Sequence, residues 1–457
     1  MEAEQAGGPW VGVSLMPHPQ YRRAIQPLLD QHLIDAIEWS CDIGWGMGGR
    51  LPAWVVDLLD QFGRAGRLFG HGVMYSPTSA IWERRQAAWL RWLERECEER
   101  RFGHITEHFG FMTAGGALEG CPLPLPFTPG AVEVGVDRLR RMHRAAGGAT
   151  PVGLENLALA MGPADAADQG PFLAAVLERL GDQGVLLLDL HNLHCQIVNF
   201  SLSAQDAIKR LACDPEGRPF RRDTHDGDVP PEIIDELLPL ALRLCPNLRV
   251  VVLERLGETI RSEADAERLR EDFCRIRSVV RDFASAQRAQ STAGAAAAAD
   301  ESAGGRATAE ADHHNNINAT TATDDDDGGG DEAALESPPF EDEELGRYQA
   351  AFLRLFVRDL SPEQLLHQLR AQPEFAPFQK YVEGFDVRCV EVASVLVRKW
   401  VRFARPKAYE SRWRRPRPDS EGEEDEEEEE EEEYAEEDGE GGDGGECDVY
   451  ESSEADE

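Results

Sequence analysis

No stretch of the sequence holds enough consecutive apolar residues to cross a bilayer, so no membrane-spanning helix is expected. The nine cysteines are widely scattered, with no Cys-x-x-Cys pair and no dense framework, which favours reduced thiols in an intracellular protein. The first residues, MEAEQAGGPW, lack the basic and then apolar layout of a secretory signal. We therefore expect a soluble, cytoplasmic protein without a membrane partner.

Lysine and arginine are missing from residues 419–457, where 24 side chains are acidic. Residues 300–344 carry 15 acidic side chains and one arginine, so the two stretches hold −38 of the formal net charge of −39. Segments of this composition stay solvated because they have almost nothing apolar to bury. The acidic balance is thus expected to belong to a linker and a tail, while the folded part is nearly neutral.

A glycine-rich GxGxxG motif is also missing after the first expected strand, which disfavours a doubly wound open sheet. Residues 10–290 instead alternate short apolar runs with helical patterns. Eight strands are expected, of which the seventh is weak, at residues 11–16, 35–39, 68–73, 104–108, 151–156, 185–192, 208–213 and 249–254. This rhythm predicts an α/β fold, a (β/α)₈ TIM barrel that forms a metal-binding domain.

Two helix starts can be placed inside this region. Thr78 and Ser79 are expected to cap a helix that runs through Arg101. Thr128 is a cap followed by a proline at the first helical position, which predicts a helix to about His143.

Downstream of the barrel, residues 291–344 have low complexity and predict a disordered linker. Residues 345–405 predict a small all-α module, with an apolar helical face from Leu345 to Leu360 and caps at Ser361 and Asp386. The module could recruit a peptide or a partner protein, or only stabilise the chain. Residues 406–457 comprise a basic segment and then the acidic tail. Nucleic acid is not an expected partner, because the acidic run would compete for the basic segment.

Histidine, carboxylate and amide side chains recur where the expected strands end. The carboxyl ends of barrel strands converge on one mouth, where active sites are built, so these residues are expected to share one pocket. They are Glu38, His71, Glu107, His108, Glu155, Asn156, Asp189, His191, Asn192, Asp223, His225 and Glu254.

Several carboxylates in one apolar mouth repel one another and are costly to desolvate, so a bound cation is the simplest compensation. Mixed imidazole and carboxylate ligands suit iron, manganese or zinc better than calcium or magnesium, and this many groups allow more than one metal ion. One such residue alone is usually a solvated loop residue. The recurrence at seven strand ends is what favours a metal site.

Six short motifs occur in a fixed order: GHGV, ITEHF, PLPLPFTPGAV, GLENLAL, LLLDLHNLHCQIVN and DTHDGDVPPEI. Over about residues 10–260 this series resembles the multinuclear non-haem iron-dependent oxidative enzymes, the TIM-barrel family of MbnB and TglH. The resemblance implies two or three bound iron (Fe) ions and dioxygen as co-substrate. It also implies a peptide or small thiol substrate that is modified at cysteine or neighbouring atoms, often with a separate protein partner that presents the peptide.

Carried over motif by motif, the resemblance implies a set of metal ligands: His71, His108, Glu155, Asp189, Asp223, His225 and Glu254. Further residues are candidates to support these ligands: Glu38, Glu107, Asn156, His191, Asn192, Arg210 and Asp214.

The sequence departs from the family pattern at the seventh strand, where RLACD stands in place of an HLAGH-like segment. Arg210 and Asp214 therefore replace two histidines, so one metal position is lost or altered. Two alternatives stay open. One is another metal-dependent barrel enzyme, such as an isomerase or a hydrolase, and the other is a degenerate barrel that binds a partner without catalysis.

Overall fold

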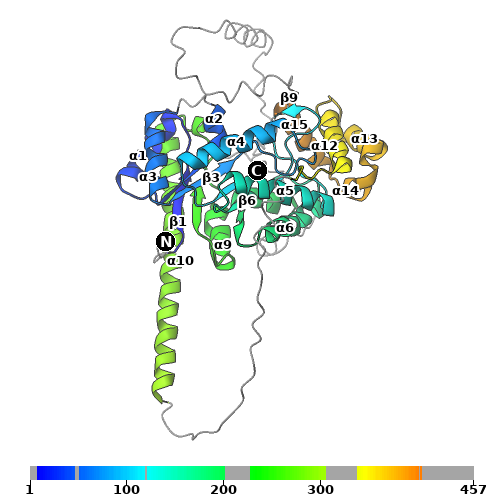
Figure 1. Cartoon of the computed structure of the whole chain (residues 1–457). Helices are drawn as coiled ribbons and strands as arrows, with labels where there is room; N and C mark the ends of the chain where they lie inside the picture. Colours follow the sequence, from blue (N-terminus) through cyan, green and yellow to red (C-terminus); the bar gives the residue numbers. More distant parts are fainter. Residues whose placement is uncertain are drawn as a thin grey trace, which may run out of the picture. The chain divides into compact units, whose positions relative to one another are not determined.

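Seven parallel strands form the centre of the structure. The computed structural model describes residues 8–46, 51–118, 121–200, 227–304, 337–400 and 402–403. The chain divides into two units, Met1–Arg414 and Arg415–Glu457, and every described residue lies in the first. The sheet has the order β7-β6-β4-β3-β2-β1-β8. Figure 1 labels β1, β3 and β6 within it. Its strands are β1 (Trp10–Ser14), β2 (Ala36–Ser40), β3 (Leu68–Gly72), β4 (Ile105–His108), β6 (Val152–Glu155), β7 (Gly184–Leu187) and β8 (Val250–Leu253).

The expected strands agree with this sheet in seven places. The remaining one, at residues 208–213, lies outside the described residues. In the described chain, β7 and β8 are the two edges of the sheet, and Leu186 of β7 is 50% exposed, whereas β2 and β3 are buried throughout. The described part is thus a half-barrel of seven parallel strands.

Helices follow most of the strands, as the alternating pattern predicts. Those of the barrel region are α1 (Pro19–Asp30), α2 (Cys41–Gly46), α3 (Ala53–Arg64), α4 (Arg84–Glu99), α5 (Pro129–Ala145), α6 (Pro163–Leu177), η1 (Glu178–Gln183), α7 (Leu190–Phe200), η2 (Ile233–Leu237), α9 (Leu238–Leu244), η3 (Gly257–Thr259) and α10 (Glu263–Gly304). α10 extends into the alanine-rich start of the segment expected to be a linker, because alanine has the highest helix propensity.

The expected start of α5 is confirmed, and that of α4 is wrong. The Thr128 hydroxyl accepts a hydrogen bond from the backbone N–H of Ala131 (3.1 Å), as a cap should. α4 begins only at Arg84, after a reciprocal cap between Glu83 and Gln86. Ser79 does not cap a helix, because its hydroxyl donates to the carbonyl of Thr113 (2.6 Å) and holds a buried loop.

A glycine sets the spacing of the two strands at one edge of the sheet. Gly153 of β6 pairs with Val185 of β7. A Cβ atom at Gly153 would lie 1.8 Å from the carbonyl oxygen of Val185, so any other residue would push the strands apart. Gly153 therefore allows β7 to pair beside the strand that ends in Glu155.

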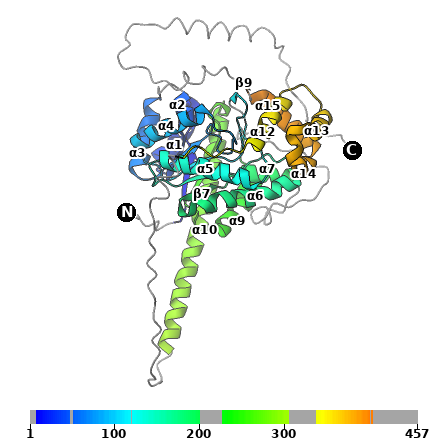
Figure 2. The ribbon, with the colours of Figure 1, turned by 45° about the vertical axis from the view of Figure 1, so that its right-hand side comes forward.

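The C-terminal module is helical and packs directly on the barrel region. It consists of α12 (Glu343–Phe356), α13 (Pro362–Ala371), η4 (Pro373–Phe378), α14 (Gln379–Glu383) and α15 (Val387–Trp400). Ser361 caps α13 as expected, and the short strand β9 (Arg402–Phe403) after α15 pairs with β5 (Ala117–Leu118). One continuous apolar core includes side chains of both regions. Figures 1 and 2 show these yellow and orange helices side by side.

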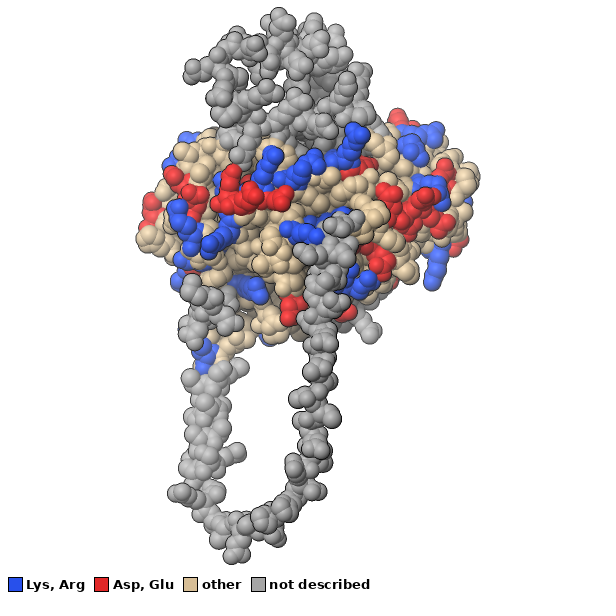
Figure 3. All heavy atoms as spheres, in the orientation of Figure 1, with Lys and Arg blue, Asp and Glu red and all other residues tan. Residues whose placement is uncertain are grey.

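Charged side chains of both signs are interspersed on the described surface seen in Figure 3. This agrees with the near neutrality of the sequence outside its two acidic stretches. Within the described ranges, no helix combines the length and the apolar character that a membrane span requires.

Asp165 of α6 lies at the junction between the barrel region and the module. Its carboxylate accepts a hydrogen bond from the backbone N–H of Met161 (2.7 Å) and lies beside Tyr381 of α14. Desolvation raises the pKa of Asp165 to about 7, against about 3.9 for an unfolded aspartate. The folded chain therefore binds this proton more tightly than the unfolded chain. Its contribution to stability is retained below about pH 4 and is lost as pH rises to about 7.

Asp165→Asn should remove the loss of stability between about pH 4 and pH 7. The amide stays neutral, and its oxygen can still accept the hydrogen bond from the Met161 N–H. We expect the variant to gain stability relative to the wild type as pH rises from 5 to 8, measured by urea unfolding. Asp182→Asn, at an exposed position of η1 directly after the same helix, is the matched control. Parallel pH profiles for Asp165→Asn and the wild type would contradict the prediction.

Candidate metal centre

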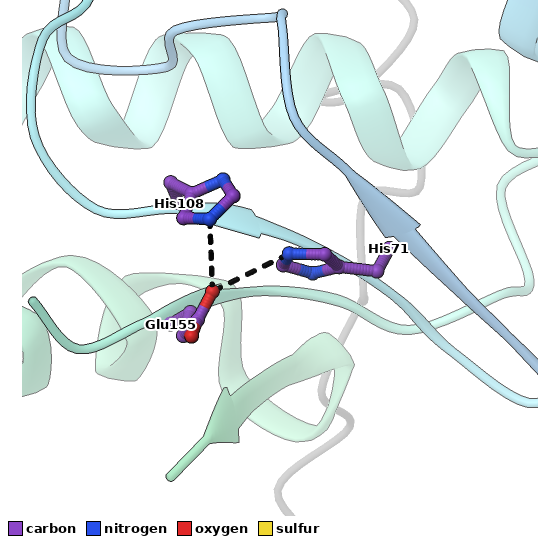
Figure 4. Close-up of side chains that lie close together, drawn as sticks. All are labelled: His71, His108 and Glu155. Carbon is purple, nitrogen blue, oxygen red and sulfur yellow. Dashed lines mark ion pairs between the residues drawn. The ribbon is translucent and has the colours of Figure 1, made fainter. Parts of the chain in front are cut away.

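Three side chains meet at the carboxyl ends of three neighbouring strands. His71 lies on β3, and His108 and Glu155 are the last residues of β4 and β6. His108 pairs in register with Glu155, and His71 pairs with Thr106, two residues before His108. Residues in register, or two apart, lie on the same face of a sheet, so the three side chains point to one side (Figure 4).

The two imidazoles converge on one carboxylate oxygen. Oε2 of Glu155 lies 3.3 Å from Nε2 of His71 and 3.4 Å from Nε2 of His108. The two rings stand edge to face with centroids 4.8 Å apart. One ligand atom from each residue lies within 4.8 Å of the other two, close enough for a single metal ion to contact all three. His71 and Glu155 are buried, and His108 is partly buried.

Thr106 orients the His71 ring. Nδ1 of His71 lies 3.0 Å from the Thr106 hydroxyl, and that hydroxyl reaches the carbonyl of Gly70 at 3.5 Å. If Thr106 donates to Gly70, it accepts from a protonated Nδ1 of His71. The lone pair of His71 then lies on Nε2, which faces Glu155. A bound ring N–H opposite the coordinating nitrogen is typical of metal-ligating histidines.

Asn192 holds the other oxygen of Glu155. Its Nδ2 donates to Oε1 of Glu155 (3.2 Å) and to the carbonyl of Asn156 (2.9 Å). The residue lies in the first turn of α7, where its backbone N–H donates to the Asp189 carboxylate (2.8 Å). The Asn156 side chain forms two hydrogen bonds with the backbone of Asp189. Its Nδ2 donates to the Asp189 carbonyl (3.1 Å), and its Oδ1 accepts from the Asp189 N–H (2.8 Å). Glu155 is thus fixed on one oxygen and presents the other to the histidines.

The sixth strand expected from the sequence, residues 185–192, corresponds to β7 but is too long. Its extension to Asn192 is wrong. β7 ends at Leu187, and α7 begins at Leu190. The reason is local, because Asp189 accepts from the N–H three residues later and so caps a helix. His191 and Asn192 therefore lie on a helix and not at a strand end.

Glu107 holds the backbone around the triad, and its Oε2 also lies 3.9 Å from Nδ1 of His108. Its two carboxylate oxygens accept from the N–H groups of Tyr75 (2.5 Å) and His108 (2.7 Å). A second buried carboxylate, Asp42, accepts from the N–H groups of Val73 and Met74, both at 2.8 Å. Desolvation raises the pKa of both carboxyls. Asp42 and Thr106 are not among the site residues expected from the sequence, although Thr106 lies two residues before His108 in the ITEHF motif.

In the described part of the chain, two further expected ligands, Asp189 and Glu254, lie outside this triad. Burial raises the pKa of the Tyr21 hydroxyl, and the carboxylates of Glu254 and Glu38 raise it further, so both lie near Tyr21. The Tyr21 hydroxyl donates to the carbonyl of Ser14 at the end of β1 (2.6 Å). Four predicted residues, Arg210, Asp214, Asp223 and His225, lie outside the described residues.

Comparisons with known proteins agree with the motif pattern. The profile of a family described as RiPP precursor modification enzyme MbnB/TglH/ChrH matches residues 24–279. A protein named UPF0276 from Streptomyces avermitilis is 30% identical over 248 residues, which are 49% of this chain and 49% of that protein. The chain thus spans about half the length of this relative.

Solved structures with some likeness to the chain include an L-ribulose 3-epimerase. It has 13% identity and a TM-score of 0.37, over 60% of this chain and 96% of that one. A D-allulose 3-epimerase from Methylomonas sp. has 12% identity and a TM-score of 0.35, over 61% and 97%. The family profile covers more than half of the sequence and spans all three residues of the triad. The chain therefore belongs to the MbnB/TglH/ChrH family of RiPP precursor modification enzymes.

Proposed function

We propose that the chain is a metal-dependent oxidative enzyme that modifies a peptide or another cysteine-containing substrate with dioxygen. The observation that carries the proposal is the convergence of His71, His108 and Glu155 at the ends of three strands. Family membership supports a ribosomally made peptide as the substrate class.

The donor set fits ferrous iron. Two imidazole nitrogens and one carboxylate oxygen, with room for further ligands, are typical of non-haem iron sites that handle dioxygen. Bound iron would supply the one-electron and dioxygen chemistry that protein side chains lack. Zinc also accepts two histidines and a glutamate, so metal analysis has to distinguish iron from zinc.

The chain's own residues prepare the site. With its hydroxyl donating to Gly70, Thr106 would favour the His71 tautomer whose Nε2 can bind a metal, and Asn192 holds one oxygen of Glu155 so that the other faces both rings. Burial of Glu155 and His71 limits access of water and strengthens the attraction between the carboxylate and a cation.

We further propose a barrel closed by residues 208–213 between the edges β7 and β8, and a domain division as expected from the sequence. The additional ligands would be Asp189, Glu254, Asp223 and His225, for a total of two or three iron ions. Arg210 and Asp214 replace histidines in this arrangement, so the lower number is favoured.

Metal analysis of the full-length chain tests the proposal. After anaerobic purification, we expect about two iron ions per chain and consumption of dioxygen when a thiol-containing peptide is added. The same protein stripped with a chelator and reloaded with zinc should consume none. A chain that takes up only zinc or manganese under these conditions, without dioxygen consumption, would rule out the oxidative function.

A further inference from the structure

The C-terminal module contacts the three loops that leave the strands of the triad. From the loop after β3, Ala80 donates its N–H to Gln349 of α12 (2.8 Å). From the loop after β4, Phe111 packs edge to face on Phe352 of α12, with centroids 6.0 Å apart. From the loop after β6, Met161 accepts from the N–H of Asp386 (2.7 Å). The module therefore contacts each of the segments that follow His71, His108 and Glu155.

The loop after β3 is buried to an unusual degree. Residues 75–80 are all buried, including the polar side chains of Ser76, Thr78 and Ser79. Ser76 adopts a φ of +55°, which a residue other than glycine rarely keeps unless its surroundings hold it there. Surface loops normally leave their backbone to water, so this loop depends on protein partners.

Protein groups supply those partners along the length of the loop. Asp42 and Glu107 accept from the three consecutive N–H groups of residues 73–75. Arg85 donates to the carbonyl of Met74 (2.7 Å), and Gln86 donates to the carbonyl of Ser76 (3.1 Å). These contacts come from the barrel region and secure the first half of the loop.

Gln349 secures the second half from the module. Its side chain is fully buried, with Nε2 donating to the carbonyl of Thr78 (2.8 Å) while Oε1 accepts from the N–H of Ala80. Two backbone groups therefore depend on one side chain from the module. The loop so held begins directly after β3, and Glu107 joins it to His108 by accepting from both Tyr75 and His108.

We propose that Gln349 is a positioning residue of the metal centre, through which the C-terminal module fixes the loop that sets His71 and His108. The module would then help to position the metal ligands, in addition to stabilising the chain. This inference rests on the proposed function, because it assumes that the triad binds a metal ion. It concerns the module of this chain and is independent of which metal is native.

The test compares three full-length proteins, each loaded with Co²⁺ as the probe. Gln349→Met keeps the volume of the side chain but removes its donor and acceptor. Phe375→Leu perturbs the module core, where Phe375 packs edge to face on Tyr348, and serves as the control for a loss of module stability. The third protein is the wild type. The visible absorption of bound Co²⁺ reports ligand geometry, and backbone hydrogen exchange of residues 74–80 reports how firmly the loop is held.

For Gln349→Met, we expect faster exchange of residues 74–80, an altered Co²⁺ spectrum and an affinity about 10–100-fold weaker, as for other groups that orient ligands. Phe375→Leu should leave the spectrum unchanged at a comparable melting temperature. An unchanged spectrum and affinity in Gln349→Met would overturn the inference alone. Failure of the wild type to bind Co²⁺ would overturn it together with the proposed metal centre. Should Gln349→Met not fold, Gln349→Asn, whose amide is one methylene shorter, gives the same comparison.

Discussion

Replacement of Glu155 by alanine is expected to abolish metal binding at the triad. Glu155 supplies the only carboxylate among the three ligand groups of this cluster, and both imidazoles face its Oε2. Without it, two neutral rings remain, which bind a divalent cation weakly. We expect a loss of affinity larger than the ~10–100-fold typical of changes behind the ligands. Anaerobic titration with Fe²⁺ and elemental analysis measure it.

The fold should survive this substitution. His71 keeps its bond to Thr106, and the β4–β6 pairing does not involve the Glu155 side chain. Glu133→Ala is the matched control, since Glu133 is an exposed carboxylate that pairs with Arg179. Undiminished metal content in folded Glu155→Ala protein would show that the triad is not the metal site.

The positions of the three triad residues could be predicted from local sequence patterns and from the topology of a parallel sheet. Each residue ends a short apolar run, and parallel strands with helical crossovers bring their carboxyl ends to one edge. The sequence motifs around His71, His108 and Glu155 mark those ends without any knowledge of which strands are neighbours. The sheet order then places β3, β4 and β6 side by side.

Side-chain partners from distant parts of the chain could not be predicted in this way. Gln349 donates a hydrogen bond to the carbonyl of Thr78, which lies 271 residues away in the sequence. No periodicity in either segment predicts this contact. Thr78 and Ser79 have the composition of a helix cap, yet their loop is held by the module and by Thr113. Local propensity is a weak guide where tertiary contacts satisfy the backbone instead.

The sixth expected strand, which corresponds to β7, shows the opposite case, because here the sequence holds a local signal for a helix. The run VLLLDLHN is apolar enough for a buried strand, which places its polar residues at the expected strand end. Asp189 is also a good helix cap, and the Asp189–Asn192 bond starts α7 there. The consequence is chemical, since the helix directs Asn192 onto Glu155.

Phe352→Ala tests whether the module and the barrel region fold as one unit. Phe352 is fully buried, is stacked on Phe356 with centroids 3.9 Å apart, and packs edge to face on Phe111 of the barrel region. Truncation of such a side chain costs about 3–5 kcal/mol, because the surrounding core collapses only partly into the cavity. Urea unfolding measures the loss, and Val395→Ala, at a position 39% exposed, should change stability by less than about 0.5 kcal/mol.

The shape of the transition carries the second part of the expectation. Seven of the nine tryptophans lie within residues 10–92, so tryptophan fluorescence mainly follows the barrel region, whereas far-UV circular dichroism follows all helices. A shared core requires both signals to shift together in Phe352→Ala, with one midpoint. If circular dichroism were lost at lower urea than fluorescence, the module would unfold by itself. Its hold on the loops after β3, β4 and β6 would then be too weak to position the histidines.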